Sequence, residues 1–142
     1  MSEDPIVATR RVAATANVAF VAFTTRMGDW WDPRLTPDPP SYDGIRVEPW
    51  VGGSITLLHV EREPYQIGEV TEWEQGRRYA QTFTLALPEP TILKVDFVSD
   101  GDGTLVTLMH TGWGSGNADQ RSKFTEWPQL LDRYADAAES SD

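Results

Sequence analysis

Hydrophobic and polar residues follow a helical period near the end of this chain and alternate along most of what precedes it. The helical pattern spans residues 113–138, and its apolar stripe consists of Phe124, Trp127, Leu131, Tyr134 and Ala138. Because residues three and four apart share one face of a helix, this stripe predicts an amphipathic C-terminal helix. Pro128 falls inside the pattern, so we expect either a kink there or a helix that begins near it.

The alternating pattern predicts seven strands. The first, Ile6–Ala14, precedes a helix capped by Thr15 and a second helical turn at Trp30 and Trp31. A proline-rich stretch then excludes regular structure up to Ser41. Six further strands are expected over 45–50, 54–60, 66–74, 78–87, 91–99 and 104–111. Their short connections leave no room for crossover helices, so the sheet must be antiparallel.

The element order is therefore one strand, two helices, six strands and a long helix. The fold class is α+β, with a curved antiparallel sheet wrapped around the C-terminal helix. The length of 142 residues suits a single domain over 1–142. We expect the polar ends, 1–4 and 139–142, to be disordered.

The net charge of the protein limits the kinds of partner that it can bind. With 22 acidic and 12 basic residues the net charge is -10, which opposes binding to nucleic acids and to anionic membranes. There are no cysteines to form disulfides or thiolate metal sites. The acidic start is not a signal peptide, and no apolar run approaches the ~20 residues of a membrane span. We therefore expect a soluble, cytoplasmic protein.

Short motifs along the chain carry a family resemblance. They are Val51-Gly52-Gly53, Gly68-Glu69-Val70, Glu72-Trp73-Glu74, Arg77-Arg78-Tyr79, the strand 104–110 and Glu126-Trp127-Pro128. Their order resembles the heat-shock protein 90 ATPase activator homologue-like family of the SRPBCC superfamily. That superfamily includes START lipid-binding domains, birch-pollen allergen-like proteins and polyketide cyclases. The resemblance implies the helix-grip (START-like) fold, with a cavity between sheet and C-terminal helix that holds an apolar small molecule.

Two positions depart from the family pattern. Glu126 stands where the family often has Gly before the helix Trp, and Phe83 stands where the aromatic strand usually ends in Trp. These departures leave the fold expectation intact but prevent the shape of the pocket from being carried over. The family shares no catalytic residues, so none is transferred to this chain.

Strand alternation and the helical stripe indicate which side chains face the expected cavity. The candidate ligand-binding residues are Trp31, Leu57, His59, Tyr79, Gln81, Phe83, Phe97, Leu108, His110, Trp127 and Leu131. His59 and His110 could act as a general base, hold the polar end of a ligand, or be hydrogen-bonded core residues. Gln81 could orient a ligand carbonyl or hydroxyl, or could bond to a neighbouring backbone group.

Two glycine-rich segments imitate known sites without matching them. Gly112, Gly114 and Gly116 lie between a strand and a helix, but the dinucleotide fingerprint needs its last Gly one position later, in a parallel βαβ unit. A flexible lid at the cavity mouth fits this segment better. The segment 100–103 lacks the closing Glu of a calcium loop and is expected to be a hairpin turn. We expect no cofactor and no metal.

Three functions remain open. The first is a binding protein for an apolar or aromatic small molecule, acting as a carrier, sequestering or resistance protein. The second is a cyclase or aromatase-type enzyme that uses the same cavity. The third is a chaperone ATPase-activating cofactor, which the family name suggests. We expect a hydrophobic small-molecule ligand as the partner, no nucleic acid or membrane, and a monomer or weak homodimer.

Overall fold

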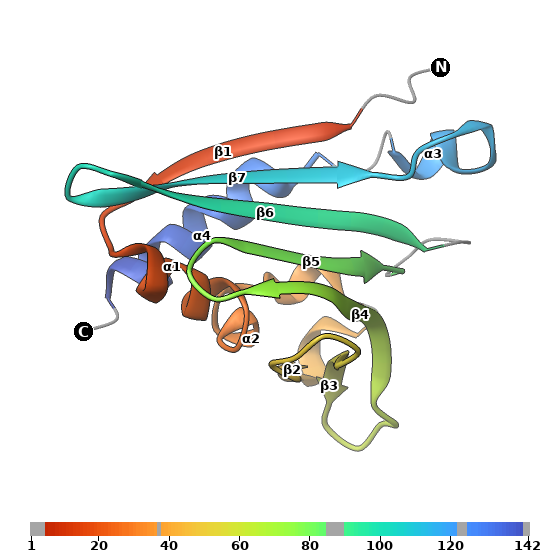
Figure 1. Cartoon of the computed structure of the whole chain (residues 1–142). Coiled ribbons are helices and arrows are strands. Elements are labelled where there is room, and N and C mark those ends of the chain that lie inside the picture. The colour runs from red at the N-terminus through yellow and green to blue at the C-terminus, as the bar shows by residue number, and fades with distance from the viewer. Residues whose placement is uncertain (1–4, 37, 85–89, 122–124, 141–142) are drawn as a thin grey trace.

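The protein is a seven-stranded antiparallel sheet that curls around its helices (Figure 1). The computed structural model describes residues 5–36, 38–84, 90–121 and 125–140. The strands are β1 (Ile6–Val12), β2 (Tyr42–Val47), β3 (Ser54–His59), β4 (Tyr65–Glu74), β5 (Arg78–Phe83), β6 (Thr91–Asp100) and β7 (Gly103–Thr111). The helices are α1 (Ala16–Phe23), α2 (Met27–Trp30), α3 (Ala118–Arg121) and α4 (Trp127–Glu139). The strand order is β1-β7-β6-β5-β4-β3-β2, so the expected helix-grip architecture is confirmed.

The alternation predicted along the central strands is present in the register of the sheet. Val95 of β6 lies opposite Leu108 of β7, and Phe97 lies opposite Val106. All four side chains are buried against the helices, whereas Lys94, between two inward positions, is exposed. The inner face is therefore apolar and the outer face is solvated, as expected for a sheet covered on one side.

The curvature of the sheet arises at β4. The pairing of β4 with β5 shifts register between Val70 and Glu72, and the pairing of β3 with β4 shifts between Ile55 and Thr56. A side chain at Gly68 would collide with the carbonyl oxygen of Thr82, so this position requires glycine. Such irregularities bend a strand, and Figure 1 shows β4 turning and carrying β3 and β2 towards α2.

The short helix α2 is held tightly against β2. A Cβ atom at Gly28 would lie 2.5 Å from the backbone nitrogen of Ile45, so only glycine allows this approach. The Tyr42 hydroxyl donates a hydrogen bond to the Gly28 carbonyl at 2.8 Å. These contacts fix the backbone just before Trp30 and Trp31, whose rings are both buried.

The C-terminal helix is shorter than the pattern of 113–138 predicts. α4 begins at Trp127, with Pro128 in its first turn, so the expected helix start near Pro128 is confirmed. A separate helix, α3, and a 3-10 turn over Ser115–Asn117 precede it, which corrects the single long helix. The Asn117 side chain accepts from the Gly114 amide at 2.7 Å, a local bond that favours a turn. Phe124, a member of the predicted stripe, lies outside the described residues.

α4 is hydrogen-bonded to the N-terminal part of the chain, at Ala13 and Ala19. Its buried face consists of Trp127, Leu130, Leu131, Tyr134, Ala135 and Ala138. The Tyr134 hydroxyl donates to the carbonyl of Ala19 in α1 at 2.7 Å. Glu139 is the last residue of α4, and its carboxylate accepts from the Ala13 amide at 2.9 Å. Of the ends expected to be disordered, 1–4 and 141–142 lie outside the described residues.

Two predictions need correction, one about the proline-rich stretch and one about the start of β2. The proline-rich stretch contains 3-10 turns at Pro33–Leu35 and Pro39–Ser41, because proline suits the first position of such a turn. β2 begins at Tyr42, three residues earlier than predicted, and a register shift near Gly44 accommodates the longer strand. Regular pairing in β5 ends at Phe83, and most of its predicted extension falls in 85–89, outside the described residues.

Candidate functional site

The inner surface of the sheet is densely packed at the end next to α1. Tyr79 makes edge-on contacts with Phe20 and Trp73, and Phe97 lies with its ring 5.2 Å from that of Phe20. The Tyr79 hydroxyl donates to the Gln81 side-chain oxygen at 2.7 Å. Burial raises the pKa of Tyr79, so the phenol stays protonated and remains a donor. Two candidate residues, Tyr79 and Phe97, therefore help to close this end.

Gln81 is fully buried and its amide is engaged on both sides. Its oxygen accepts from Tyr79, and its nitrogen donates to the Thr82 carbonyl at 3.0 Å. Of the two alternatives left open for this residue, the structure shows the bond to a neighbouring backbone group. A ligand could use this amide only through its second N–H or its second lone pair unless it broke one of these bonds.

Four of the candidate aromatic and histidine side chains meet where α4 begins. Trp127 of α4 lies 5.9 Å from Trp31, 5.9 Å from Phe83 and 5.8 Å from His110 between ring centroids. The rings are mostly perpendicular, an arrangement that aromatic pairs favour. Leu57, Leu108 and Leu131 are fully buried in the same hydrophobic core. Sequence alternation thus correctly places residues far apart in the chain on one inner surface.

His110 is the hydrogen-bonded centre of this group. The Thr91 hydroxyl donates to the Phe83 carbonyl at 2.9 Å, so its single proton is used. The 2.6 Å contact between Thr91 Oγ1 and His110 Nε2 therefore requires a proton on Nε2. Trp127 Nε1 donates to His110 Nδ1 at 3.3 Å, which fits a bare Nδ1.

Burial lowers the pKa of His110 to about 4. The imidazole is therefore neutral near pH 7, with its proton on Nε2 and both nitrogens occupied. A general base needs a free lone pair aimed at its substrate, and His110 has none in this arrangement. The geometry matches the hydrogen-bonded core histidine that the sequence left open.

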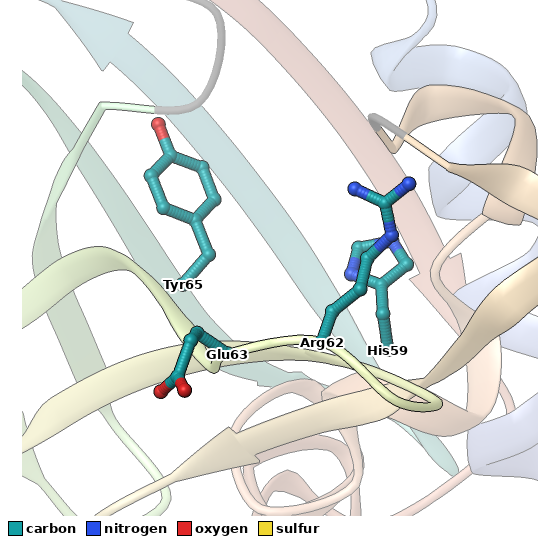
Figure 2. A pocket seen from close by; sticks show the side chains of 4 residues that line it. All are labelled: His59, Arg62, Glu63 and Tyr65. Carbon is teal, nitrogen blue, oxygen red and sulfur yellow. The ribbon is translucent and has the colours of Figure 1, made fainter.

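The opposite end of the inner surface is hollowed, at the hairpin between β3 and β4. A hollow of about 420 Å³ is lined by His59, Arg62, Glu63 and Tyr65. Figure 2 shows His59, Arg62 and Tyr65 projecting to the same side of the hairpin, whereas the Glu63 carboxylate points away from them. Glu61 in the turn has a φ of 62°, an uncommon left-handed conformation for a non-glycine residue. The volume lies within the usual range of small-molecule sites, about 300–1,000 Å³.

His59 differs from His110 in its bonding. Its side chain is buried in the wall of the hollow, and its Nε2 has no hydrogen-bond partner among the described residues. The Nε1 atom of Trp31 is also buried without a partner in the described part of the chain. Unpaired buried polar atoms are costly and uncommon in native proteins, so each calls for an explanation.

Arg62 is the charged group at the mouth of the hollow. Its Nε lies 3.0 Å from a carboxylate oxygen of Asp38, and its side chain is about half exposed. Asp38 also accepts a 2.6 Å hydrogen bond from the Ser41 hydroxyl. That bond, with the charge of Arg62, holds the pKa of Asp38 below its usual value. Asp38, which directly precedes the 3-10 turn Pro39–Ser41, thereby orients the guanidinium.

Three residues of the hollow were missed from the sequence. Arg62 and Glu63 follow β3 in a hairpin turn, and Tyr65 begins β4 one residue before the predicted strand 66–74, so strand alternation made no prediction about their direction. A charged segment directly after the inward-facing His59 was the available signal. Among the described residues, no cluster of three or more His, Cys, Asp or Glu side chains is placed to hold a metal ion.

A curved antiparallel sheet gripping a C-terminal helix defines the START-like class of domain. A family model described as activator of Hsp90 ATPase homolog 1-like protein matches residues 13–139. The chain therefore belongs to this family, a member of the superfamily that its motifs resemble. No curated protein matches the chain by sequence. None of the helices in the described residues has the length and apolarity to span a bilayer.

Solved structures with the same fold cover nearly the whole chain. Protein NE0264 from Nitrosomonas europaea superposes with a TM-score of 0.73 at 16% identity, covering 99% of this chain and 97% of that one. The Aha1 dimer from Colwellia psychrerythraea gives 0.70 at 20% identity, covering 96% of each chain. Txn09, an anthrahydroquino-gamma-pyrone synthase complexed with SUM, gives 0.63 at 28% identity, covering 96% and 99%. The first two support the fold alone.

Proposed function

We propose that this START-like domain binds an apolar or aromatic small molecule in a site that includes the hollow at the β3–β4 hairpin. Its role would be to carry or sequester that molecule, including sequestration that confers resistance to it. The observation that carries the proposal is the hollow beside His59, a buried side chain whose Nε2 has no partner among the described residues. The His59 ring must turn for Nε2 to reach a ligand in the hollow, and the hydrogen bond that the protein itself does not supply would favour that change.

The arrangement of the candidate residues supports a ligand that enters from the β3–β4 end. Trp31 supplies an aromatic wall and an unpartnered indole nitrogen, and Leu57 and Phe83 supply apolar surface. Tyr79, Gln81 and Phe97 then form the closed end through their mutual bonds and ring contacts. In this proposal the first group contacts the ligand and the second group supports the site.

Two measurements test the binding function. Native mass spectrometry of protein purified from its own host should reveal a co-purified mass of small-molecule size. Titration with N-phenylnaphthylamine, a neutral apolar fluorophore, should give saturable binding with a stoichiometry of one and quenching of Trp emission. Burial of the probe should also produce a negative heat-capacity change in calorimetry. Absence of both a co-purified ligand and saturable probe binding would refute the proposal.

An enzyme of the cyclase or aromatase type is the second candidate, favoured by the 28% identity to the synthase Txn09. In this alternative the cavity folds a reactive chain and His59 assists proton transfer. Incubation with a synthetic poly-β-ketone thioester should then give cyclised product with more than one turnover per protein. His59→Phe should lower that rate by on the order of 10²–10⁴-fold. Absence of turnover by wild-type protein would leave the binding function alone.

The remaining expectations are proposals as well. A monomer or weak homodimer is compatible with the Aha1 neighbour, which its description calls a dimer. Light scattering over a range of protein concentrations would distinguish the two states. Activation of a chaperone ATPase ranks third, and a direct ATPase assay with and without this protein would test it.

A further inference from the structure

We infer that the hollow at the β3–β4 hairpin recognises an acidic oxygen on the bound molecule, such as a carboxylate, sulfonate or ionised phenol, through Arg62. This inference rests on the proposed binding function and adds the chemical class of the ligand. It concerns the hairpin end of the cavity only, where the charged and hydrogen-bonding groups gather.

The first support is the chemistry of the lining. Arg62 and the Tyr65 hydroxyl can donate hydrogen bonds, and both project to the same side of the hairpin (Figure 2). The Glu63 carboxylate, the acceptor among the lining residues, points away from that side. A ligand oxygen placed over the hairpin would therefore meet donors, and a charged oxygen accepts such bonds most strongly.

The second support is the way Arg62 is held. Asp38 engages the guanidinium through Nε at 3.0 Å, and Ser41 in turn fixes Asp38. A guanidinium has donors along two edges, so pairing at Nε orients the group and leaves its outer Nη edge for a second oxygen. Figure 2 shows both Nη atoms directed away from the hairpin backbone, above the His59 ring.

The third support is His59 itself. Its side chain is more than nine-tenths buried in the wall, and its Nε2 has no partner among the described residues. The imidazole therefore has unused hydrogen-bonding capacity next to the guanidinium. Arg62, Tyr65 and His59 line one hollow of about 420 Å³, so the guanidinium belongs to a shaped surface, unlike an isolated surface charge.

The net charge of -10 makes the test demanding, because the field of the whole protein repels anions. Preference for an anionic ligand must therefore come from a local contact. Arg11 provides a matched control, since it is similarly exposed and also pairs with one carboxylate, Asp100, at 3.2 Å, while lying outside the hollow. Removal of either arginine makes the same change in net charge.

The experiment compares two probes that differ by one acidic group: anilinonaphthalene sulfonate and neutral N-phenylnaphthylamine. The quantity measured is the ratio of their affinities for wild-type protein, Arg62→Gln, Arg62→Lys and Arg11→Gln. Arg62→Gln should lower the ratio in favour of the neutral probe by about one-and-a-half- to fivefold, the size expected for a partly exposed ion pair. Arg62→Lys should lower it less, and Arg11→Gln should leave it near the wild-type value.

Three results of this experiment would count against the inference about Arg62. An unchanged ratio in Arg62→Gln, or an equal fall in Arg11→Gln, would overturn the inference while leaving the binding function in place, provided the neutral probe binds. Failure of both probes to bind wild-type protein would overturn the binding function and this inference together. If Arg62→Gln does not fold, Tyr65→Phe provides a second variant, and a ratio unaffected by loss of that hydroxyl would count against the inference.

Discussion

His110 and His59 occupy equivalent positions, each facing inward near the end of a sheet strand, yet their surroundings are opposite. His110 bonds through both ring nitrogens to Thr91 and Trp127. His59 lies beside a hollow and has a buried nitrogen without a partner among the described residues. The group around His110 is therefore a finished core, whereas the surroundings of His59 at the β3–β4 hairpin retain unmet hydrogen-bonding capacity. A protein that binds a ligand needs this division between a rigid support and an incomplete site.

The largest expected effect concerns the packed end. Trp127→Ala should lower the free energy of unfolding by about 3–5 kcal/mol, because it removes a fully buried indole and its ring contacts. Trp50→Ala is the matched control, since Trp50 is 55% exposed, and should change stability by less than about 0.5 kcal/mol. Urea unfolding measures both values. Similar effects of the two substitutions would show that the packed end is not the core described here.

The same substitution at the two histidines should have opposite effects. His110→Phe leaves the buried Trp127 Nε1 without an acceptor and should cost about 1–3 kcal/mol of stability. His59→Phe removes an unsatisfied nitrogen and should leave stability equal or raise it by up to about 1 kcal/mol. Thermal unfolding of both variants provides the comparison. A loss of stability in His59→Phe as large as that in His110→Phe would remove the distinction between the two ends.

His59→Phe should also weaken ligand binding. The loss of affinity in His110→Phe should be smaller. Loss of one hydrogen bond to the ligand corresponds to about 1–3 kcal/mol in affinity. Titration with anilinonaphthalene sulfonate measures this for both variants alongside the unfolding data. A variant that becomes more stable while binding more weakly is the behaviour expected of a functional residue. Unchanged affinity in His59→Phe would exclude His59 from the site.

A further effect is a pH dependence of stability that belongs to His110. Its pKa is about 4 in the folded protein, against an ordinary value of 6.5 in the unfolded chain. Between these values the unfolded chain binds a proton that the folded protein does not, so stability falls as the pH falls from 6.5 to about 4. The slope approaches about 1.4 kcal/mol per pH unit and the total is on the order of 3 kcal/mol. Above pH 6.5 the contribution is absent.

Comparison with His110→Phe isolates this contribution from that of the carboxylates, which titrate in both proteins. The stability advantage of the wild-type protein over the variant should shrink as the solution is acidified through this window. Urea unfolding at a series of pH values gives the difference directly. A difference independent of pH would mean that His110 is not held neutral by burial.

The sequence indicated which side chains point inward, but it did not indicate which of them have all their hydrogen bonds. Strand alternation correctly predicts that His59 and His110 face inward, because the period of a strand is a local property. The partners of His110 are residues 17 and 19 positions away. One distance depends on the pairing of β6 with β7, and the other on the packing of Trp127 of α4 against the His110 ring. No local pattern distinguishes a satisfied inward histidine from an unsatisfied one.

The same reasoning explains the other differences. The order of elements and the family follow from motifs and periodicity spread along the whole chain. The shortened α4 depends on Pro128, which the sequence does show, together with the local bonds of Asn117, which it does not. Arg62 was missed because a turn has no period, and its place over His59 is set by Asp38, 24 residues earlier in the chain.

The central claim is that a ligand binds at the unsatisfied end of the inner surface, and nuclear magnetic resonance of the indole protons tests it most directly. Trp30, Trp113 and Trp127 each donate through Nε1 to a protein acceptor, whereas Trp31 Nε1 is buried without one among the described residues. On titration with N-phenylnaphthylamine, the Trp31 indole resonance should shift most and that of Trp30 least. A shift confined to the exposed Trp50 indole, with Trp31 unmoved, would contradict the account.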